Sequence, residues 1–95
     1  MEFVTNLNGL TDELTLVDFF ATWCGPCKML APVLEQADKE VKILEVDVDK
    51  ARELASEYGI ASIPTLILFK NKKVLDQKMG YMPYNALMSW INQYK

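Results

Sequence analysis

Residues 14–28 read LTLVDFFATWCGPCK, an almost continuous apolar run that leads into two cysteines three positions apart. A run of this kind is typical of a strand covered on both faces, as the strands of parallel sheets are. Downstream of it, apolar side chains recur at helical spacing at Cys27, Leu30, Ala31, Leu34 and Ala37. The sequence therefore predicts a buried strand over residues 14–21, followed by a helix from Cys24 to about Glu40.

The rest of the chain continues this alternation of strands and helices. We expect a short edge strand over residues 2–7, a polar stretch over 8–13 that can hold one helical turn, and strands over 43–48, 65–69 and 73–79. The last two strands are joined tightly through Asn71-Lys72, so they should form an antiparallel hairpin. Helices are expected after Asp49, which can cap one that Gly59 ends, and after Pro83. This order indicates a single α/β domain over residues 1–95, with a parallel first half and helices on both faces of the sheet.

Composition excludes several classes of function. The chain has 95 residues and a formal net charge of −3, without a basic run that could neutralise a phosphate backbone, so nucleic acid is not an expected partner. It has no histidine, which removes Ser-His-Asp and Cys-His nucleophiles and most zinc sites. No apolar stretch is long enough to span a bilayer and no signal segment opens the chain, so we expect a cytoplasmic protein that does not associate with membranes.

The cysteine pair lies where the predicted strand ends and the predicted helix begins. There the unpaired N–H groups of the first turn and the helix dipole stabilise negative charge, which should lower the pKa of the Cys24 thiol and favour the nucleophilic thiolate. Cys27 follows one turn later on the same side, close enough to bond to Cys24. Because Cys27 belongs to the apolar stripe, we expect an exposed attacking Cys24 and a more buried resolving Cys27.

Two other roles for the pair remain open, although both are less favoured. A zinc site would need two further ligands, which only carboxylates or a second chain could supply here. A purely structural disulfide would close a very small loop, and short loops stabilise a fold least.

Asp18 is the second candidate, because it lies in the middle of the most apolar strand, where a charge is costly. Burial should raise its pKa and make it an acid or base for the nearby cysteines. The alternative is an aspartate at the strand end that reaches solvent or a backbone donor. A third signal, Pro64 within Ile63-Pro64-Thr65, means little alone, since proline is tolerated at the start of a strand.

Taken together, these residues resemble the thioredoxin family over essentially the whole chain. The active-site block VDFFATWCGPCKMLAP over residues 17–32 is highly specific, and the later landmarks YGI (58–60), IPTL (63–66) and Gly80 follow in the family's order. The resemblance implies a mixed five-stranded sheet whose first three strands are parallel and last two antiparallel, with four helices divided between its faces. It also implies that Pro64 is cis and faces the cysteine pair.

The resemblance further implies a general protein-disulfide reductase. Cys24 would attack a substrate disulfide, and Cys27, deprotonated with help from Asp18, would resolve the mixed disulfide and leave a Cys24–Cys27 disulfide. The implied substrate-docking residues are Trp23, Gly25, Pro26, Ile63, Pro64 and Gly80, with Tyr81 either among them or in the core. The chain would be a monomer with no bound cofactor, and a flavoprotein thioredoxin reductase would supply electrons from NADPH.

Several positions depart from the family pattern. The chain is shorter than is usual for the family, with the loss in a first helix reduced to residues 8–13, and Phe20 stands where many members have tryptophan. Glu45 stands beside Asp18 where bacterial members often have lysine; it either turns inward, so that two carboxyls share a poorly solvated site, or turns to solvent. Two rival functions remain: the same fold as a binding or assembly subunit whose cysteines are dispensable, and an oxidase or isomerase of an oxidising compartment.

Overall fold

A five-stranded mixed sheet in the order β1-β3-β2-β4-β5 runs through the computed structural model, which describes all residues from 1 to 95. The strands are β1 (Glu2–Phe3), β2 (Thr15–Phe20), β3 (Lys42–Asp47), β4 (Thr65–Lys70) and β5 (Lys73–Met79). β3 is parallel to both β1 and β2, whereas β4 is antiparallel to β2 and to β5. This arrangement confirms the predicted sheet, although the first strand covers only Glu2–Phe3 rather than residues 2–7.

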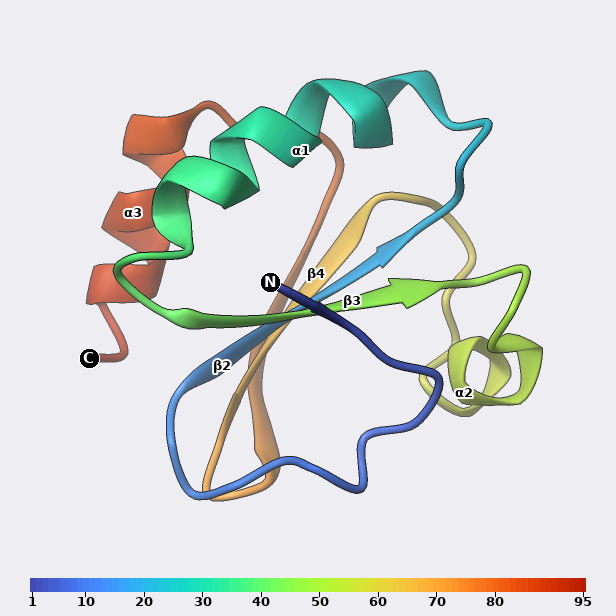
Figure 1. Cartoon of the computed structure of the whole chain (residues 1–95). Coiled ribbons are helices and arrows are strands. Elements are labelled where there is room, and N and C mark those ends of the chain that lie inside the picture. Colours follow the sequence, from blue (N-terminus) through green and yellow to red (C-terminus); the bar gives the residue numbers. More distant parts are fainter.

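Three helices cover the sheet: α1 (Gly25–Ala37), α2 (Arg52–Glu57) and α3 (Tyr84–Asn92). In Figure 1, α1 and α3 lie on one side of the sheet and α2 on the other. The expectation of four helices with a shortened first one is wrong, because residues 8–13 form turns and bends. Side-chain oxygens of Asn6 and Thr11 accept the backbone N–H groups of Asn8 and Glu13 at 3.0 and 3.3 Å, and such local bonds favour turns over a helix.

The expected cap of α2 is also wrong. Ala51 precedes the helix without a side-chain cap, and the carboxylate of Asp49 instead accepts a hydrogen bond from the indole N–H of Trp23 at 2.8 Å. Asp49 therefore binds Trp23, which is distant in the sequence, instead of capping α2.

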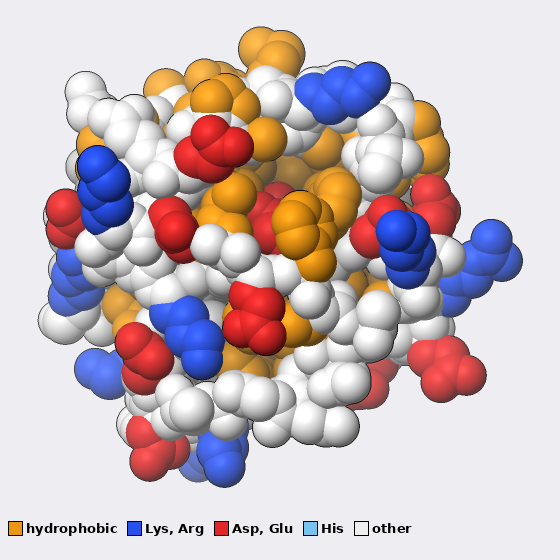
Figure 2. Space-filling model, viewed as in Figure 1, with side chains coloured by type: hydrophobic (Ala, Val, Ile, Leu, Met, Phe, Trp, Pro, Cys, Tyr) orange, Lys and Arg blue, Asp and Glu red, His pale blue; other side chains and the backbone are white.

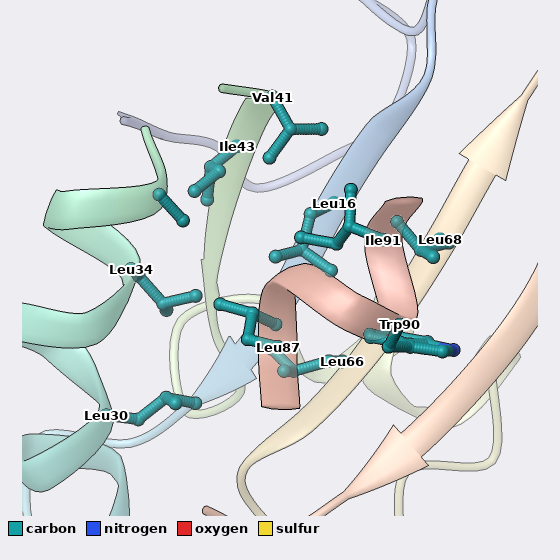
Figure 3. Packing of buried hydrophobic residues seen from close by; sticks show 11 residues of the cluster. Leu16, Leu30, Leu34, Val41, Ile43, Leu66, Leu68, Leu87, Trp90 and Ile91 are labelled. Atoms are coloured by element: carbon teal, nitrogen blue, oxygen red, sulfur yellow. The ribbon is translucent and has the colours of Figure 1, made fainter. Parts of the chain in front are cut away.

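Strand periodicity divides the core into two layers. The α1/α3 side holds a cluster that includes Leu16, Leu30, Leu34, Leu87 and Ile91, and Figure 3 shows these side chains converging between the two helices and the sheet. On the α2 side lies a second cluster: Leu10, Val17, Phe19, Leu44, Val46, Ala51, Ile67 and Phe69. Since β2 contributes Leu16 to one layer and Val17 and Phe19 to the other, Asp18 lies on the α1 side of the sheet.

The hairpin between β4 and β5 turns at Asn71 and Lys72, as predicted. Both residues have positive φ, 54° and 65°, the combination found in the two-residue turns that match strand twist. Asparagine tolerates this region better than lysine does, so Lys72 adopts an unfavourable backbone conformation.

Candidate active site

The end of β2 and the start of α1 together position Cys24. It is the N-cap of α1, with an extended backbone, and its Sγ accepts the backbone N–H of Cys27 at 3.2 Å. Pro26 occupies the first turn, where its missing N–H is not needed. A thiolate at this position would lie against a free helix N–H and the positive end of the helix dipole, which is the expected setting for a reactive Cys24.

Cys24 and Cys27 are joined by a disulfide bond, with their Cα atoms 5.2 Å apart. Both residues are buried, with only 5% and 6% of their surfaces exposed, so the expected contrast between an exposed Cys24 and a buried Cys27 is wrong. The reason is tertiary: Ala21 packs with the two cysteines, and Phe20, Val48 and Ile63 pack around them. The two sulfurs differ instead in their partners, because only the Cys24 sulfur receives a backbone N–H.

The loop before β4 lies directly beside Cys24. The Ile63–Pro64 peptide bond is cis, as expected, and the Ile63 carbonyl oxygen is 3.8 Å from the Cys24 Sγ. Gly80, whose φ is +90°, donates its N–H to the Pro64 carbonyl at 2.8 Å. The structure thus brings Ile63, Pro64 and Gly80 from distant parts of the chain to the cysteine pair.

Exposed residues surround the buried disulfide. Trp23, Gly25 and Pro26 are all exposed, and the Trp23 side chain, 68% exposed, is held by Asp49. Tyr81 is 43% exposed, which excludes it from the core. Pro64 itself is buried.

The sequence alone did not identify two residues of this surface, Met79 and Asp49. Met79 is 67% exposed, and the Ser62 hydroxyl lies 3.2 Å from its sulfur. Met79 stands next to Gly80 at the end of its strand, and that adjacency is a signal that could have identified it. Nothing in the local sequence around Asp49 indicates that it binds Trp23.

Asp18 is buried on the α1 side of the sheet, with 3% of its surface exposed and its Oδ1 lacking a hydrogen-bond partner. Burial raises the pKa of Asp18, while a hydrogen bond with Glu45 acts in the opposite direction. This excludes the alternative of an aspartate that reaches solvent at the strand end.

Glu45 turns inward. It is the direct neighbour of Asp18 in the β2–β3 register and is 5% exposed. Burial, followed by the hydrogen bond to Asp18 and its charge, raises the pKa of Glu45 to about 10. The two carboxyls therefore share one poorly solvated site.

Comparison with known proteins identifies the family to which this chain is similar. The family model described as Thioredoxin matches residues 1–93. The chain is 48% identical over 87 residues to thioredoxin of Rickettsia felis, covering 87% of this chain and 83% of that protein. It is 44% identical over 88 residues to thioredoxin of Bacillus subtilis, covering 88% and 85%. The chain belongs to the thioredoxin family.

Solved thioredoxin structures agree with this assignment. The X-ray structure of Fasciola hepatica thioredoxin superposes with a TM-score of 0.90 at 33% identity and full coverage of both chains. The structure of a point mutant of Halobacterium salinarum thioredoxin also gives 0.90, at 36% identity, covering 97% of this chain and 88% of that one. With its cysteine pair at the family's active-site position, this thioredoxin-family chain is a dithiol–disulfide reductase.

Two further observations concern metal ions and membranes. No group of three or more His, Cys, Asp or Glu side chains is arranged to hold a metal ion. No helix combines the length and apolar character needed to cross a membrane.

Proposed function

We propose that residues 1–95 act as a single thioredoxin domain and reduce disulfides in other proteins through a mixed-disulfide intermediate. The Cys24 thiolate attacks one sulfur of the substrate disulfide, forming a new S–S bond while the other substrate sulfur leaves as a thiolate. Cys27 then loses its proton and attacks the Cys24 sulfur, which forms the Cys24–Cys27 bond and releases the second substrate sulfur. The observation that carries this order is the N–H of Cys27 directed at the Cys24 sulfur at the start of α1.

Asp18 is the proposed proton acceptor for Cys27. It lies on the sheet face that α1 covers, on the strand that leads to the cysteine loop, between Leu16 and Phe20. A carboxylate with a raised pKa is a stronger base near neutral pH than an ordinary aspartate is. Only the second step needs the Cys27 proton removed, so Asp18 acts in resolution.

The exposed surface around the disulfide is the proposed docking site for substrate. It comprises the exposed Trp23, Gly25 and Pro26, with the half-buried Ile63 and Gly80 and the buried Pro64 beside Cys24, and we add the exposed Tyr81 and Met79. The Ile63 backbone beside Cys24 suits pairing with an extended substrate segment, in the manner of an added β-strand. An extended segment paired there would carry its disulfide toward Cys24.

Regeneration completes the proposed cycle. The Cys24–Cys27 disulfide is reduced by a flavoprotein thioredoxin reductase that draws electrons from NADPH, so this chain binds no cofactor. It works as a monomer in the cytoplasm, where the thiol pool keeps exchange running in the reducing direction.

NADPH-coupled reduction of insulin, with candidate thioredoxin reductases supplied, tests the proposal. We expect NADPH consumption with the wild-type chain, none with Cys24→Ser, and none with Cys27→Ser. Incubated with native insulin, whose disulfides are intact, Cys27→Ser should accumulate a mixed disulfide that mass spectrometry maps to Cys24. A double cysteine variant that keeps the chain's cellular role would instead favour the binding-subunit function.

A further inference from the structure

Glu45 is a buried ionisable group that the mechanism above does not use. We propose that Glu45 acts through Asp18 as a positioning residue and releases its own proton to water in a groove beside β1 as Asp18 accepts the proton of Cys27. The inference rests on the proposed function, because it concerns the step in which Asp18 accepts that proton.

The two carboxyl groups are placed to share a proton. Asp18 and Glu45 are paired in the β2–β3 register and lie on the same face of the sheet. Asp18 is 3% exposed, Glu45 is 5% exposed, and neither takes part in an ion pair. Two charges so close in a dry site would repel, so ionisation of one carboxyl group favours a retained proton on the other.

We assign that proton to Glu45, which is the carboxyl group that lines the groove. The hydrogen bond between the two carboxyls raises the pKa of Glu45 and opposes the rise in the pKa of Asp18, as expected when the Glu45 hydroxyl donates to an ionised Asp18. Two other charged groups act on Glu45 in opposite directions and less than burial and Asp18 do: the Met1 amine lowers its pKa and Asp38 raises it.

Of the two carboxyl groups, only that of Glu45 lines the groove beside β1. The groove has a volume of about 340 Å³, and its lining includes Phe3, Phe20, Glu45, Asp47 and Lys50 but not Asp18. The Phe3 ring meets the Phe20 ring edge-on, with centroids 5.8 Å apart, and Phe3 is 71% exposed. Figure 2 shows hydrophobic side chains gathered around a hollow on this side of the molecule, with acidic atoms inside it.

The proposed step balances. The Cys27 thiol gives its proton to the Asp18 carboxylate, and its sulfur bonds to Cys24 while the substrate sulfur leaves with the bonding electron pair. As Asp18 gains this proton it no longer holds the Glu45 hydroxyl, and in the same step that hydroxyl turns to the groove and gives its own proton to water. The proton now on Asp18 lies in the hydrogen bond between the two carboxyls and returns to Glu45, so the pair holds one proton before and after.

Ellman's reagent, an aromatic disulfide, separates this step from the first attack. Mixing it with the reduced chain should release one coloured thiolate in a concentration-dependent phase, when Cys24 attacks. A second should follow in a concentration-independent phase, when Cys27 resolves the mixed disulfide. The second phase is measured in mixtures of H₂O and D₂O to count the protons that move in this step. The rate depends linearly on the deuterium fraction when one proton moves, and the dependence is curved when two protons move.

We expect a curved dependence for wild type. Glu45→Gln, which keeps a hydrogen-bond donor for Asp18 but has no proton to pass on, should give a linear dependence and slow the second phase on the order of tenfold, with the first phase unchanged. Asp47→Asn removes a carboxylate from the same groove and should behave as wild type, and Glu45→Asp should restore the curvature.

The outcomes separate this inference from the function on which it rests. A linear dependence in wild type, or the same curve in Glu45→Gln, overturns the role of Glu45 while leaving Cys24 and Cys27 as assigned. Failure of the wild-type chain to release the second thiolate overturns the proposed function itself.

Discussion

Asp18 and Glu45 form a site in which neither carboxyl group has a cation to neutralise it. For Asp18 the consequence for stability follows from linkage. Well below pH 3.8 the carboxyl is protonated in both the folded and the unfolded chain. As the pH rises further, the unfolded chain loses the proton while the folded chain keeps it, so stability falls until the raised folded-state pKa is passed.

Asp18→Asn should therefore stabilise the fold at neutral pH, by about 1–2 kcal/mol, the scale of a buried polar group without its partner. Between pH 4 and pH 9 the gain should be smallest at the acid end and should grow until the raised folded-state pKa of Asp18 is passed. Denaturant unfolding of both proteins over that range measures it. Parallel stability curves would show that Asp18 does not ionise in a buried site.

The same variant, Asp18→Asn, should slow resolution of the mixed disulfide more than its formation.

Glu45→Lys should lower the pKa of Asp18. The change replaces a neighbouring carboxyl with an ammonium group, which favours the ionised form of Asp18 through opposite charge. Carbon-13 NMR titration of the Asp18 side-chain carboxyl follows the effect directly, with Asp47→Asn as a control outside the pair. An unchanged titration midpoint would mean that the two side chains do not interact.

At the level of single elements, the hairpin turn allows a clean stability test. Lys72 has a φ of 65°, which glycine adopts without strain, so Lys72→Gly should stabilise the fold by roughly 0.5–1 kcal/mol and leave disulfide reduction unchanged. Asn71→Gly is the matched control, and its gain should be smaller because asparagine tolerates positive φ. Chemical denaturation of the three proteins provides the comparison, and a less stable Lys72→Gly would contradict the turn assignment.

Elements whose residues pack in one regular pattern could be predicted from the sequence. The apolar runs indicated β2 and β3, and the helical spacing of Leu30 and Leu34 indicated α1, because burial imposes those periodicities directly. The failures occurred where short polar segments had a choice of partners. Residues 8–13 satisfy their backbone through turns, and Asp49 binds Trp23 rather than the α2 terminus.

On the scale of the whole molecule, the candidate site draws on the end of β2, the start of α1, the loop before β4 and the end of β5. The cysteine motif and the buried Asp18 were predictable because their chemistry is local. The equal burial of the two cysteines was not, since Val48 and Ile63 reach them from far along the chain. Exposure of Met79 and Tyr81 likewise depends on how β5 and the loop after it meet the cysteine loop.

Exposure at the docking surface leads to a prediction for substrates. Truncating the exposed Met79 side chain to alanine should weaken the interaction with protein disulfides, raising KM for insulin by a few-fold, because about 1 kcal/mol of apolar contact corresponds to a factor of about 5. Reduction of Ellman's reagent, which is small, should be unaffected. Met29→Ala is the control, since Met29 is similarly exposed but belongs to α1. An equal loss with both disulfides would assign Met79 to the fold rather than to docking.

The different roles of the two sulfurs are tested most directly by limited alkylation of the reduced chain. Iodoacetamide is added over a range of pH, and peptide mass mapping measures the rate of modification at each cysteine. We predict that Cys24 alone reacts at neutral pH, with a midpoint below the value of about 8.5 for a free cysteine, while Cys27 reacts only slowly. Faster modification of Cys27 than of Cys24 would reverse the assigned roles and contradict the mechanism.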